Sequence, residues 1–342
     1  MKKFLLPEEG QFYKANLHCH STYSDGKLAP EELKKIYKEE GYSILAYTDH
    51  NVLISHSELA DESFLPLNGY ELDVTEVLEP ETAFCFRKTC HFCLIALDPD
   101  NLTQVCFHRS RYFGKAAPHA GEVVFDDSLP DYERVYTPEC INDMMKKGRD
   151  SGFFVTYNHP TWSLESYEQY MAYEHMNAME ICNNSCLAMG YNDYNPRVYD
   201  DILRSGKRIL CIATDDNHNG HPRESGRWDS FGGFTMIKAD RLEYKPVTDA
   251  LVKGNFYASQ APLIHSLWFE DGKVHITCSD ARCISMDTGI RKSTIVYGQN
   301  GAPVTEASFD ITKEMVYFRL TVTDERGKHA NTNAYFTDEL FD

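Results

Sequence analysis

Histidine and aspartate residues that could bind a metal ion lie close together near the start of the chain. The stretch NLHCHSTYSDG, residues 16–26, contains His18 and His20, one residue apart, and Asp25 five residues later. Imidazole and carboxylate groups are common ligands of Zn²⁺, Mn²⁺ and Fe²⁺ in proteins. A single His-x-His pair is a weak signal in a chain with 14 histidines, so the hypothesis of a metal site needs further ligands elsewhere.

Further residues of these types fall at the tips of runs that have the composition of β-strands. In a parallel α/β barrel the carboxyl ends of the strands meet at one mouth, so such residues would converge there. Two more strand-like runs, 177–183 and 232–239, complete the series. The predicted strands and their tip residues are 12–18 with His18 and His20, 43–49 with Asp49 and His50, 65–71 with Glu71, 91–97 with His91, 153–159 with His159, and 209–215 with Asp216 and His218.

Helix-like segments alternate with these strands. Pro30 begins an amphipathic segment that ends near Gly41, and the pairs Thr137-Pro138 and Asn195-Pro196 each place a capping residue before a proline. The alternation predicts an α/β fold, a parallel barrel of seven or eight strands over residues 1–260. The aromatic stretch 162–176 is expected to be a helix that covers the barrel, or alternatively a wall of the substrate site.

Two regions depart from this alternation. Residues from about 98 to 137 show no regular period, which indicates an insertion or lid over the barrel mouth. Residues 261–342 contain alternating runs with turn signals at Asp271-Gly272 and Asn300-Gly301, which predict a small C-terminal β-sheet domain.

The ordered motifs resemble those of a known family. His-x-His, a downstream Asp, Asp-His, Glu, His, Asn-His and Asp-x-His follow one another over residues 12–260, as in the PHP (polymerase and histidinol phosphatase) superfamily of metal-dependent hydrolases. The stretch FGGFTMIKADRLEYKPVTDALVKGNFYASQAP and the tail DERGKHANTNAYF look like the CehA/McbA-type branch. The resemblance implies a distorted (β/α)7-type, TIM-like barrel with a small C-terminal β domain.

The resemblance also implies three metal positions, and hence two to three divalent transition metal ions of Mn, Fe or Zn. The family's Asp-x-His spacing selects Asp216 and leaves Asp215 as a supporting carboxylate. The implied ligands are His18, His20, Glu71 and Asp216 for the first position, Glu71 as a bridge with His91 and His159 for the second, and Asp25, His50 and His218 for the third.

Such a cluster favours hydrolysis, because ions bridged by one carboxylate share a water molecule and lower its pKa toward neutrality. We therefore expect a metal-dependent hydrolase that uses a metal-bridging hydroxide. Asp49 is expected to act in catalysis or to orient a neighbouring ligand. In the loop HNGHPRESGR, we expect His221, Arg223 and Arg227 to bind an anionic group, with His221 as a proton donor and Arg227 also catalytic.

A phosphoesterase acting on a small phosphorylated substrate is the first functional hypothesis. An amide or carbamate ester hydrolase is the alternative, because the branch resemblance indicates it. A non-catalytic metal-binding or interaction module is a third possibility, and the complete ligand set argues against it.

Composition limits the partners. The 34 basic and 52 acidic residues give a net charge of −18, which repels nucleic acids and acidic membranes. We therefore expect a small anionic substrate and no nucleic acid or membrane partner, and the sequence leaves the oligomeric state undetermined. The eleven cysteines, an odd number, and the absence of a long apolar stretch predict a cytoplasmic protein with reduced thiols.

Overall fold

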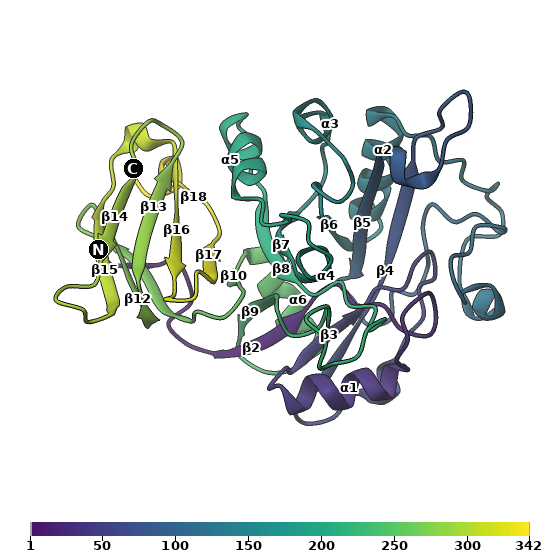
Figure 1. Cartoon of the computed structure of the whole chain (residues 1–342), viewed down its shortest axis with the longest axis horizontal. Helices are drawn as coiled ribbons and strands as arrows, with labels where there is room; N and C mark the ends of the chain where they lie inside the picture. Colours follow the sequence, from purple (N-terminus) through teal and green to yellow (C-terminus); the bar gives the residue numbers. More distant parts are fainter. Residues whose placement is uncertain (1, 342) are drawn as a thin grey trace.

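All eight strands predicted in the first 240 residues are present in the computed structural model, which describes residues 2–341 (Figure 1). Most of their residues are buried, as expected for strands that are covered on both faces. These strands are β2 (Gln11–Asn16), β3 (Ile44–Tyr47), β4 (Leu65–Thr75), β5 (Thr89–Ala96), β6 (Phe153–Tyr157), β7 (Ala178–Asn183), β8 (Leu210–Thr214) and β9 (Phe234–Ala239).

The helices begin where capping residues and prolines predicted them. Proline occupies the first turn of α1 (Pro30–Glu39), α2 (Pro138–Asp150) and α5 (Pro196–Arg204), where no intrahelical N–H bond is lost. The Thr137 hydroxyl also accepts a hydrogen bond from the Cys140 N–H at the start of α2. The remaining helices are α3 (Tyr167–Ala172), α4 (Asn184–Ala188) and α6 (Tyr244–Lys253).

The aromatic stretch 162–176 differs from the predicted helix. Only α3 is helical there, because a tight turn occupies the preceding residues: the Ser163 N–H donates to the His159 carbonyl, and Leu164 has a φ of +58°. The prediction of a helix over the whole stretch is therefore wrong. The turn presents Trp162 to the side of the barrel that carries the metal-type residues.

The sheet is mixed, whereas a purely parallel barrel was expected. Strands β2–β3–β4 and β6–β7–β8 pair in parallel, but β5 runs antiparallel to both β4 and β6. A loop without an α-helix joins β4 to β5, so the chain returns as a hairpin rather than through a helical crossover. Strand β9 also pairs antiparallel with β2.

The strands nevertheless curl around one apolar interior, which contains a buried residue from every strand from β2 to β9 and is completed by residues of α6. It includes Ala15, Ile44, Leu67, Ile95, Phe154, Ala178, Ile212 and Ile237. Between β8 and β9 no backbone ladder forms among the described residues; instead the Thr235 hydroxyl donates to the Ala213 carbonyl at 3.0 Å. The fold is therefore a distorted barrel whose ladder stays open at this seam.

The C-terminal part is rich in β-strands and lies at one end of the molecule, close to both termini (Figure 1). The short strand β1 (Lys3–Phe4) pairs with β11, and β17 continues the barrel sheet by pairing with β10 (Phe256–Ser259). The buried Arg319 on β16 also donates two hydrogen bonds, at 2.9 and 2.8 Å, to Asp200 on α5. The strands of this part are β11 (Ile264–Glu270), β12 (Lys273–Ala281), β13 (Cys283–Thr288), β14 (Thr294–Tyr297), β15 (Val304–Asp310), β16 (Tyr317–Thr323), β17 (His329–Thr332) and β18 (Tyr335–Phe336).

Residues 98–137 contain one short 3₁₀ segment, Ala117–Glu122, before α2 begins at Pro138, and are otherwise irregular. None of the helices in the described part of the chain has the length and apolar character needed to span a membrane.

The seam between β8 and β9 provides a test of the fold. A Cβ atom at Gly233 would lie 2.2 Å from the Thr214 carbonyl oxygen, a backbone atom that cannot move away cheaply. We expect Gly233→Ala to destabilise the protein by about 1–3 kcal/mol, as overpacking does elsewhere, and to lower the melting temperature measured by calorimetry. Gly226→Ala is the control, since a Cβ there has no neighbour within 4 Å. Equal melting temperatures for the two variants would contradict the close approach.

Candidate metal centre

The predicted ligands lie together at one edge of the sheet, although they come from distant parts of the chain. The antiparallel direction of β5 is essential here, because it brings His91, near the start of its strand, beside Glu71 on β4. The His91 Nδ1 atom lies 3.2 Å from Glu71 Oε1. The structure thus brings together all nine predicted ligands: His18, His20, Asp25, His50, Glu71, His91, His159, Asp216 and His218.

Glu71 lies at the centre of the cluster. Its carboxylate is 1% exposed and has five imidazoles around it, so nearly all of its surroundings are potential metal ligands. Glu71 Oε1 lies 3.3 Å from a ring nitrogen of His18, 3.2 Å from one of His91 and 3.4 Å from one of His159. Glu71 Oε2 lies 3.0 Å from a ring nitrogen of His50 and 3.4 Å from one of His20.

The first group of donors has the spacing of a metal coordination shell. His18 Nε2 and His20 Nε2 lie 3.1 Å apart, and they lie 3.2 and 3.0 Å from Asp216 Oδ1. Ligands bound tetrahedrally at 2.0–2.1 Å are separated from one another by about 3.3 Å, which matches these distances. A shared cation would satisfy the two facing nitrogens, which cannot both donate to each other. His18, His20, Glu71 and Asp216 therefore fit the first implied position.

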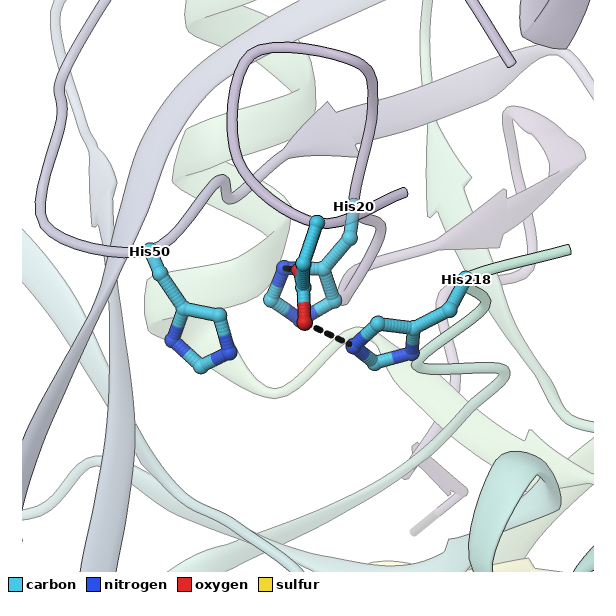
Figure 2. A group of neighbouring side chains, drawn as sticks. His20, His50 and His218 are labelled. Atoms are coloured by element: carbon cyan, nitrogen blue, oxygen red, sulfur yellow. Dashed lines mark ion pairs between the residues drawn. The ribbon is translucent and has the colours of Figure 1, made fainter. Parts of the chain in front are cut away.

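A second group surrounds Asp25, as expected for the third position. Figure 2 shows the imidazoles of His20, His50 and His218 converging from three separate segments. Asp25 Oδ2 lies 3.3 Å from His218 Nε2, and Asp25 Oδ1 lies 3.7 Å from His20 Nδ1. His20 Nδ1 is buried without a hydrogen-bond partner among the described residues, an arrangement that is costly unless a ligand binds there. His20 thus faces both groups.

Glu71, His91 and His159, the donors of the second implied position, are less clearly separated from the other two groups. His159 Nε2 lies 3.8 Å from Asp216 Oδ2 in addition to its contact with Glu71. His50 and His91 can share Glu71, so His50 faces both this position and the third one. The buried Cys93 thiol also lies close to His18 and Glu71. It receives a hydrogen bond from the Asn158 amide at 3.1 Å, and burial raises its pKa, which favours the neutral thiol.

The charges in the cluster stabilise one another. Burial opposes protonation of both His159 and His218. Nevertheless, the neighbouring Glu71 and Asp216 raise the pKa of His159 to about 9. Asp25 and Asp216 raise the pKa of His218 to about 10. Burial alone would raise the pKa of Glu71, yet the neighbouring histidines hold it well below its usual range. His50 differs, because burial lowers its pKa to about 4. Without a metal, protons on His18, His159 and His218 would partly balance the carboxylates.

Several buried polar groups orient the ligands. Glu180 on β7 accepts hydrogen bonds from His18 Nδ1 at 2.8 Å and from the His159 N–H at 3.0 Å. The first bond leaves His18 Nε2 directed at the cluster. A buried glutamate within an apolar strand is the sequence signal for such a role, because it requires partners.

Asp49 and Asp215 also act on the ligand loops rather than on the cavity. Asp49 accepts hydrogen bonds from the Ser21 N–H at 2.8 Å and the Ser24 hydroxyl at 2.6 Å, so it fixes the loop between His20 and Asp25. It does not line the cavity described below. Asp215 accepts from the N–H groups of residues 231–233, and burial raises its pKa to about 7.

Two ligands adopt a strained backbone. His159 has a φ of +27° and Asp216 a φ of +51°, in the left-handed region that non-glycine residues seldom enter. Hydrogen bonds hold both residues in place: the His159 N–H donates to Glu180, and the Asp216 N–H donates to the His18 carbonyl at 2.9 Å. Strain of this kind persists where surrounding contacts fix it, and it is concentrated at functional sites.

Seven of the nine predicted ligands, all except His18 and His20, form the floor of a cavity of about 390 Å³. His221 and Arg227, two of the three residues expected to bind an anion, line this cavity. Arg223 does not; its guanidinium forms an ion pair with Glu40 and lies over the Phe231 ring. The structure therefore leaves two of these residues available to a substrate in the cavity.

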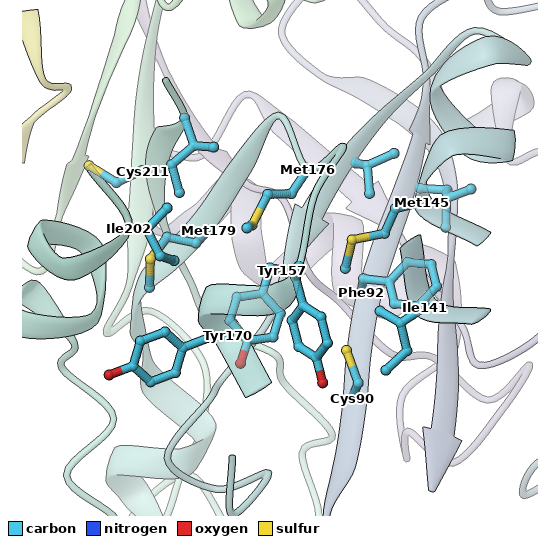
Figure 3. Close-up of a cluster of buried hydrophobic side chains, with 14 of the residues drawn as sticks. Cys90, Phe92, Ile141, Met145, Tyr157, Tyr170, Met176, Met179, Ile202 and Cys211 are labelled. Carbon is cyan, nitrogen blue, oxygen red and sulfur yellow. The ribbon is translucent and has the colours of Figure 1, made fainter. Parts of the chain in front are cut away.

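The strands that carry the ligands rest on a common core. Figure 3 shows Phe92 of β5, Tyr157 of β6 and Met179 of β7 packed with Ile141 and Met145 of α2. All of these side chains are buried, so the strand ends that carry the histidines have little freedom to move apart.

Replacement of the central carboxylate tests the metal centre directly. We expect Glu71→Gln, which keeps the size of the side chain but removes its charge, to abolish binding of at least one ion per chain, measured by elemental analysis and calorimetric titration with Mn²⁺ or Zn²⁺. Glu9→Gln, at an exposed position, is the control and should retain the metal content of the unaltered protein. Undiminished binding by the Glu71 variant would contradict the central role of this carboxylate.

The raised histidine pKa values predict a pH dependence of the metal-free protein. Protonated His159 and His218 contribute stability that is complete below their ordinary pKa of 6.5 and is lost as the pH rises through about 9 and about 10. The melting temperature of chelator-treated protein should therefore fall between pH 7 and 10, and metal loading at pH 7 should release a proton from each histidine. Calorimetry in buffers of different ionisation enthalpy measures the release. Metal uptake without proton release would show that these histidines are neutral beforehand.

This chain is similar to a known protein family and to several known proteins. Residues 16–251, more than two thirds of the chain, match the family model of the PHP domain. A 5'-3' exoribonuclease of Haemophilus influenzae is 45% identical over 49 residues, which cover 14% of this chain and 18% of that protein. The match therefore spans less than a fifth of the length of this relative.

Two solved structures are similar at low identity. One, a two-domain protein from Bacteroides vulgatus containing a predicted PHP-like metal-dependent phosphoesterase, is 15% identical over 94% of both chains, with a TM-score of 0.46. The other, an amidohydrolase from Chromobacterium violaceum with bound sulfate and no metal, is 16% identical over 60% of this chain and 87% of that chain, with a TM-score of 0.38. The family match over residues 16–251 shows that this chain belongs to the PHP domain family.

Proposed function

We propose that this protein is a metal-dependent phosphoesterase that hydrolyses a small phosphorylated molecule. The observation that carries the proposal is the cluster of six imidazoles and three carboxylates, seven of which line a cavity whose wall holds Arg227 and His221. Two to three Mn, Fe or Zn ions would occupy this floor. When bound, such ions activate water and take up the charge that develops on a phosphoryl oxygen.

Residues of the chain itself supply the remaining functions. Arg227 presents a planar guanidinium that matches two phosphate oxygens, and the net charge of −18 makes a local cation important for an anionic substrate. His221 would donate a proton to the leaving oxygen. Glu180 and Asp49 would orient the ligand histidines and the Asp25 loop through the hydrogen bonds described above.

The alternative is an amide or carbamate ester hydrolase, consistent with the CehA/McbA-type branch that the sequence resembles. It would use the same metal floor and differ in the bond that is cleaved. We prefer the phosphoesterase because of Arg227. The complete ligand cluster argues against a non-catalytic binding module. A cytoplasmic location stays part of the proposal, supported by eleven cysteines that are all free.

A substrate panel tests the reaction. Protein purified without chelator should contain at least one transition metal ion per chain and should hydrolyse aryl phosphates faster than aryl carbamates. Absence of metal, with no activity on addition of Mn²⁺, Fe²⁺ or Zn²⁺, would exclude the hydrolase. Hydrolysis of carbamates alone would replace the first reaction with the alternative.

The anion-binding role has a matched pair of variants. Arg227→Ala should lower kcat/KM on an aryl phosphate by about 10–100-fold, the loss expected for a charge-assisted hydrogen bond. Arg223→Ala, which removes a guanidinium engaged with Glu40 outside the cavity, should leave this parameter unchanged. Equal effects of the two substitutions would remove Arg227 from the substrate site.

A further inference from the structure

Part of the wall above the metal floor is apolar, and the side chains of this part come from loops and turns between the strands and helices. We define the apolar rim as Phe84, Phe113, Trp162 and Met189, which line the cavity together with the ligands. Phe84 lies in the loop between β4 and β5, Phe113 in the insertion 98–137, Trp162 in the turn after His159, and Met189 directly after α4. Four separate loops thus place large apolar side chains at one opening.

The rim reaches down to the metal ligands. The Phe113 ring lies 4.7 Å from the His50 ring, and the Trp162 ring lies 5.3 Å from His91 and 5.0 Å from His159. Phe84 extends this surface outward, with its ring 6.0 Å from that of Trp162. A molecule that contacts the floor of the cavity would therefore contact aromatic rings within the same small volume.

The rim is exposed in the free protein. Phe84, Phe113 and Met189 are 47%, 49% and 47% exposed, although large apolar side chains are usually buried. An apolar patch of this kind beside a polar centre is typical of a small-molecule site, because covering it removes apolar surface from water.

The position of Phe113 is fixed before any ligand binds. The neighbouring Lys115 N–H donates to the Ser24 carbonyl at 2.6 Å, next to the ligand Asp25. Gly114 between them has a φ of +56°, and a Cβ there would lie 2.3 Å from the same carbonyl oxygen. This close backbone contact ties the insertion to the Asp25 loop and holds the Phe113 ring over His50.

The charges around the cavity limit the substrate to one anionic group. Apart from histidines, Arg227 is the only cationic side chain among the described residues that line it. The two lining carboxylates outside the ligand set are already engaged: Asp73 accepts from the Asn51 amide at 2.9 Å, and Asp229 accepts from the His218 N–H at 2.8 Å. Additional phosphates or several sugar hydroxyls would find few partners among the four apolar side chains.

We infer that the substrate is an aryl monoester, in which a single anionic group at the metal floor is attached to an aromatic group that packs against the apolar rim. This inference rests on the proposed phosphoesterase function for the nature of the anion. The aromatic group is inferred from the rim alone. Phe84 and Phe113 act as specificity-determining residues for it.

A pair of non-hydrolysable ligands separates the rim from the anion site. Calorimetric titration of the metal-loaded protein with phenylphosphonate and methylphosphonate measures affinity without requiring turnover. We expect phenylphosphonate to bind about tenfold more tightly or better, because its ring covers apolar surface that the methyl group leaves exposed. Phe84→Ala should reduce this preference several-fold and leave the Kd of methylphosphonate unchanged.

Phe86→Ala is the matched control, because Phe86 lies two residues from Phe84, is 70% exposed and does not line the cavity. It should retain the full preference for the phenyl ligand. Phe113→Ala should also reduce the preference, with its metal content measured in parallel because this ring touches His50. Equal Kd values for the two phosphonates, or equal losses for both ligands in Phe84→Ala, would overturn the rim as a specificity element.

A second pair, benzoate and acetate, distinguishes the two proposals. If neither phosphonate binds but benzoate binds more tightly than acetate, the rim is supported and the phosphoesterase is not. If both phosphonates bind equally and aryl and alkyl phosphates are hydrolysed alike, the phosphoesterase is supported and the rim is overturned. Absence of a phenyl preference in both pairs also overturns the rim.

Discussion

The buried carboxylate of Glu71 is the constraint on which the rest of the site depends. Five imidazoles lie within 3.4 Å of its two oxygens, and the side chain has almost no access to water. An isolated carboxylate in such a place would be costly, so the cluster requires positive charge at its centre. Of the five histidines around it, His18 and His159 have a raised pKa and would carry this charge in the metal-free protein, whereas divalent ions would supply it in the loaded protein. Metal binding would then be coupled to folding at this residue.

The topology of the sheet follows from the same requirement. Glu71 on β4 and His91 on β5 must lie at the same edge of the sheet to contact each other. The hairpin between the two strands makes β5 antiparallel to β4 and so brings the two residues together. Glu180 on β7 then orients His18 from β2, across the barrel. The left-handed backbone at His159 and Asp216 directs both side chains inward at the tips of β6 and β8. Three departures from regular barrel geometry, the antiparallel β5 and the left-handed backbone at His159 and Asp216, thus lie at predicted ligands.

The cavity combines two opposed environments. Its floor is made of carboxylates and imidazoles, and its rim is made of four large apolar side chains, of which Phe84, Phe113 and Met189 are exposed to solvent. The insertion 98–137 contributes to both, because its contact with Ser24 supports the Asp25 loop while Phe113 covers His50. Under the proposed function, the floor would carry out the hydrolysis and the rim would select the substrate.

Much of this molecule could be predicted from the sequence, because strand and helix signals are local. Apolar runs located all eight barrel strands, and capping residues with proline located the starts of α1, α2 and α5. The residue types of the nine predicted ligands and their order at successive strand tips predicted a cluster of imidazoles and carboxylates, and the structure brings these side chains together. The prediction of a helix over 162–176 was wrong because the turn at Ser163 and Leu164 depends on contacts with His159.

Strand direction, side-chain orientation and exposure depend on contacts between residues far apart in the chain, and only the tertiary structure decided them. It made β5 antiparallel, gave His20 a place in two ligand groups, and turned Asp49 toward Ser21 and Ser24. It also directed Arg223 to Glu40, away from the cavity, and brought Phe84, Phe113, Trp162 and Met189 to a common opening. Sequence spacing carries no information on such pairings, because each is set by which distant segments pack together.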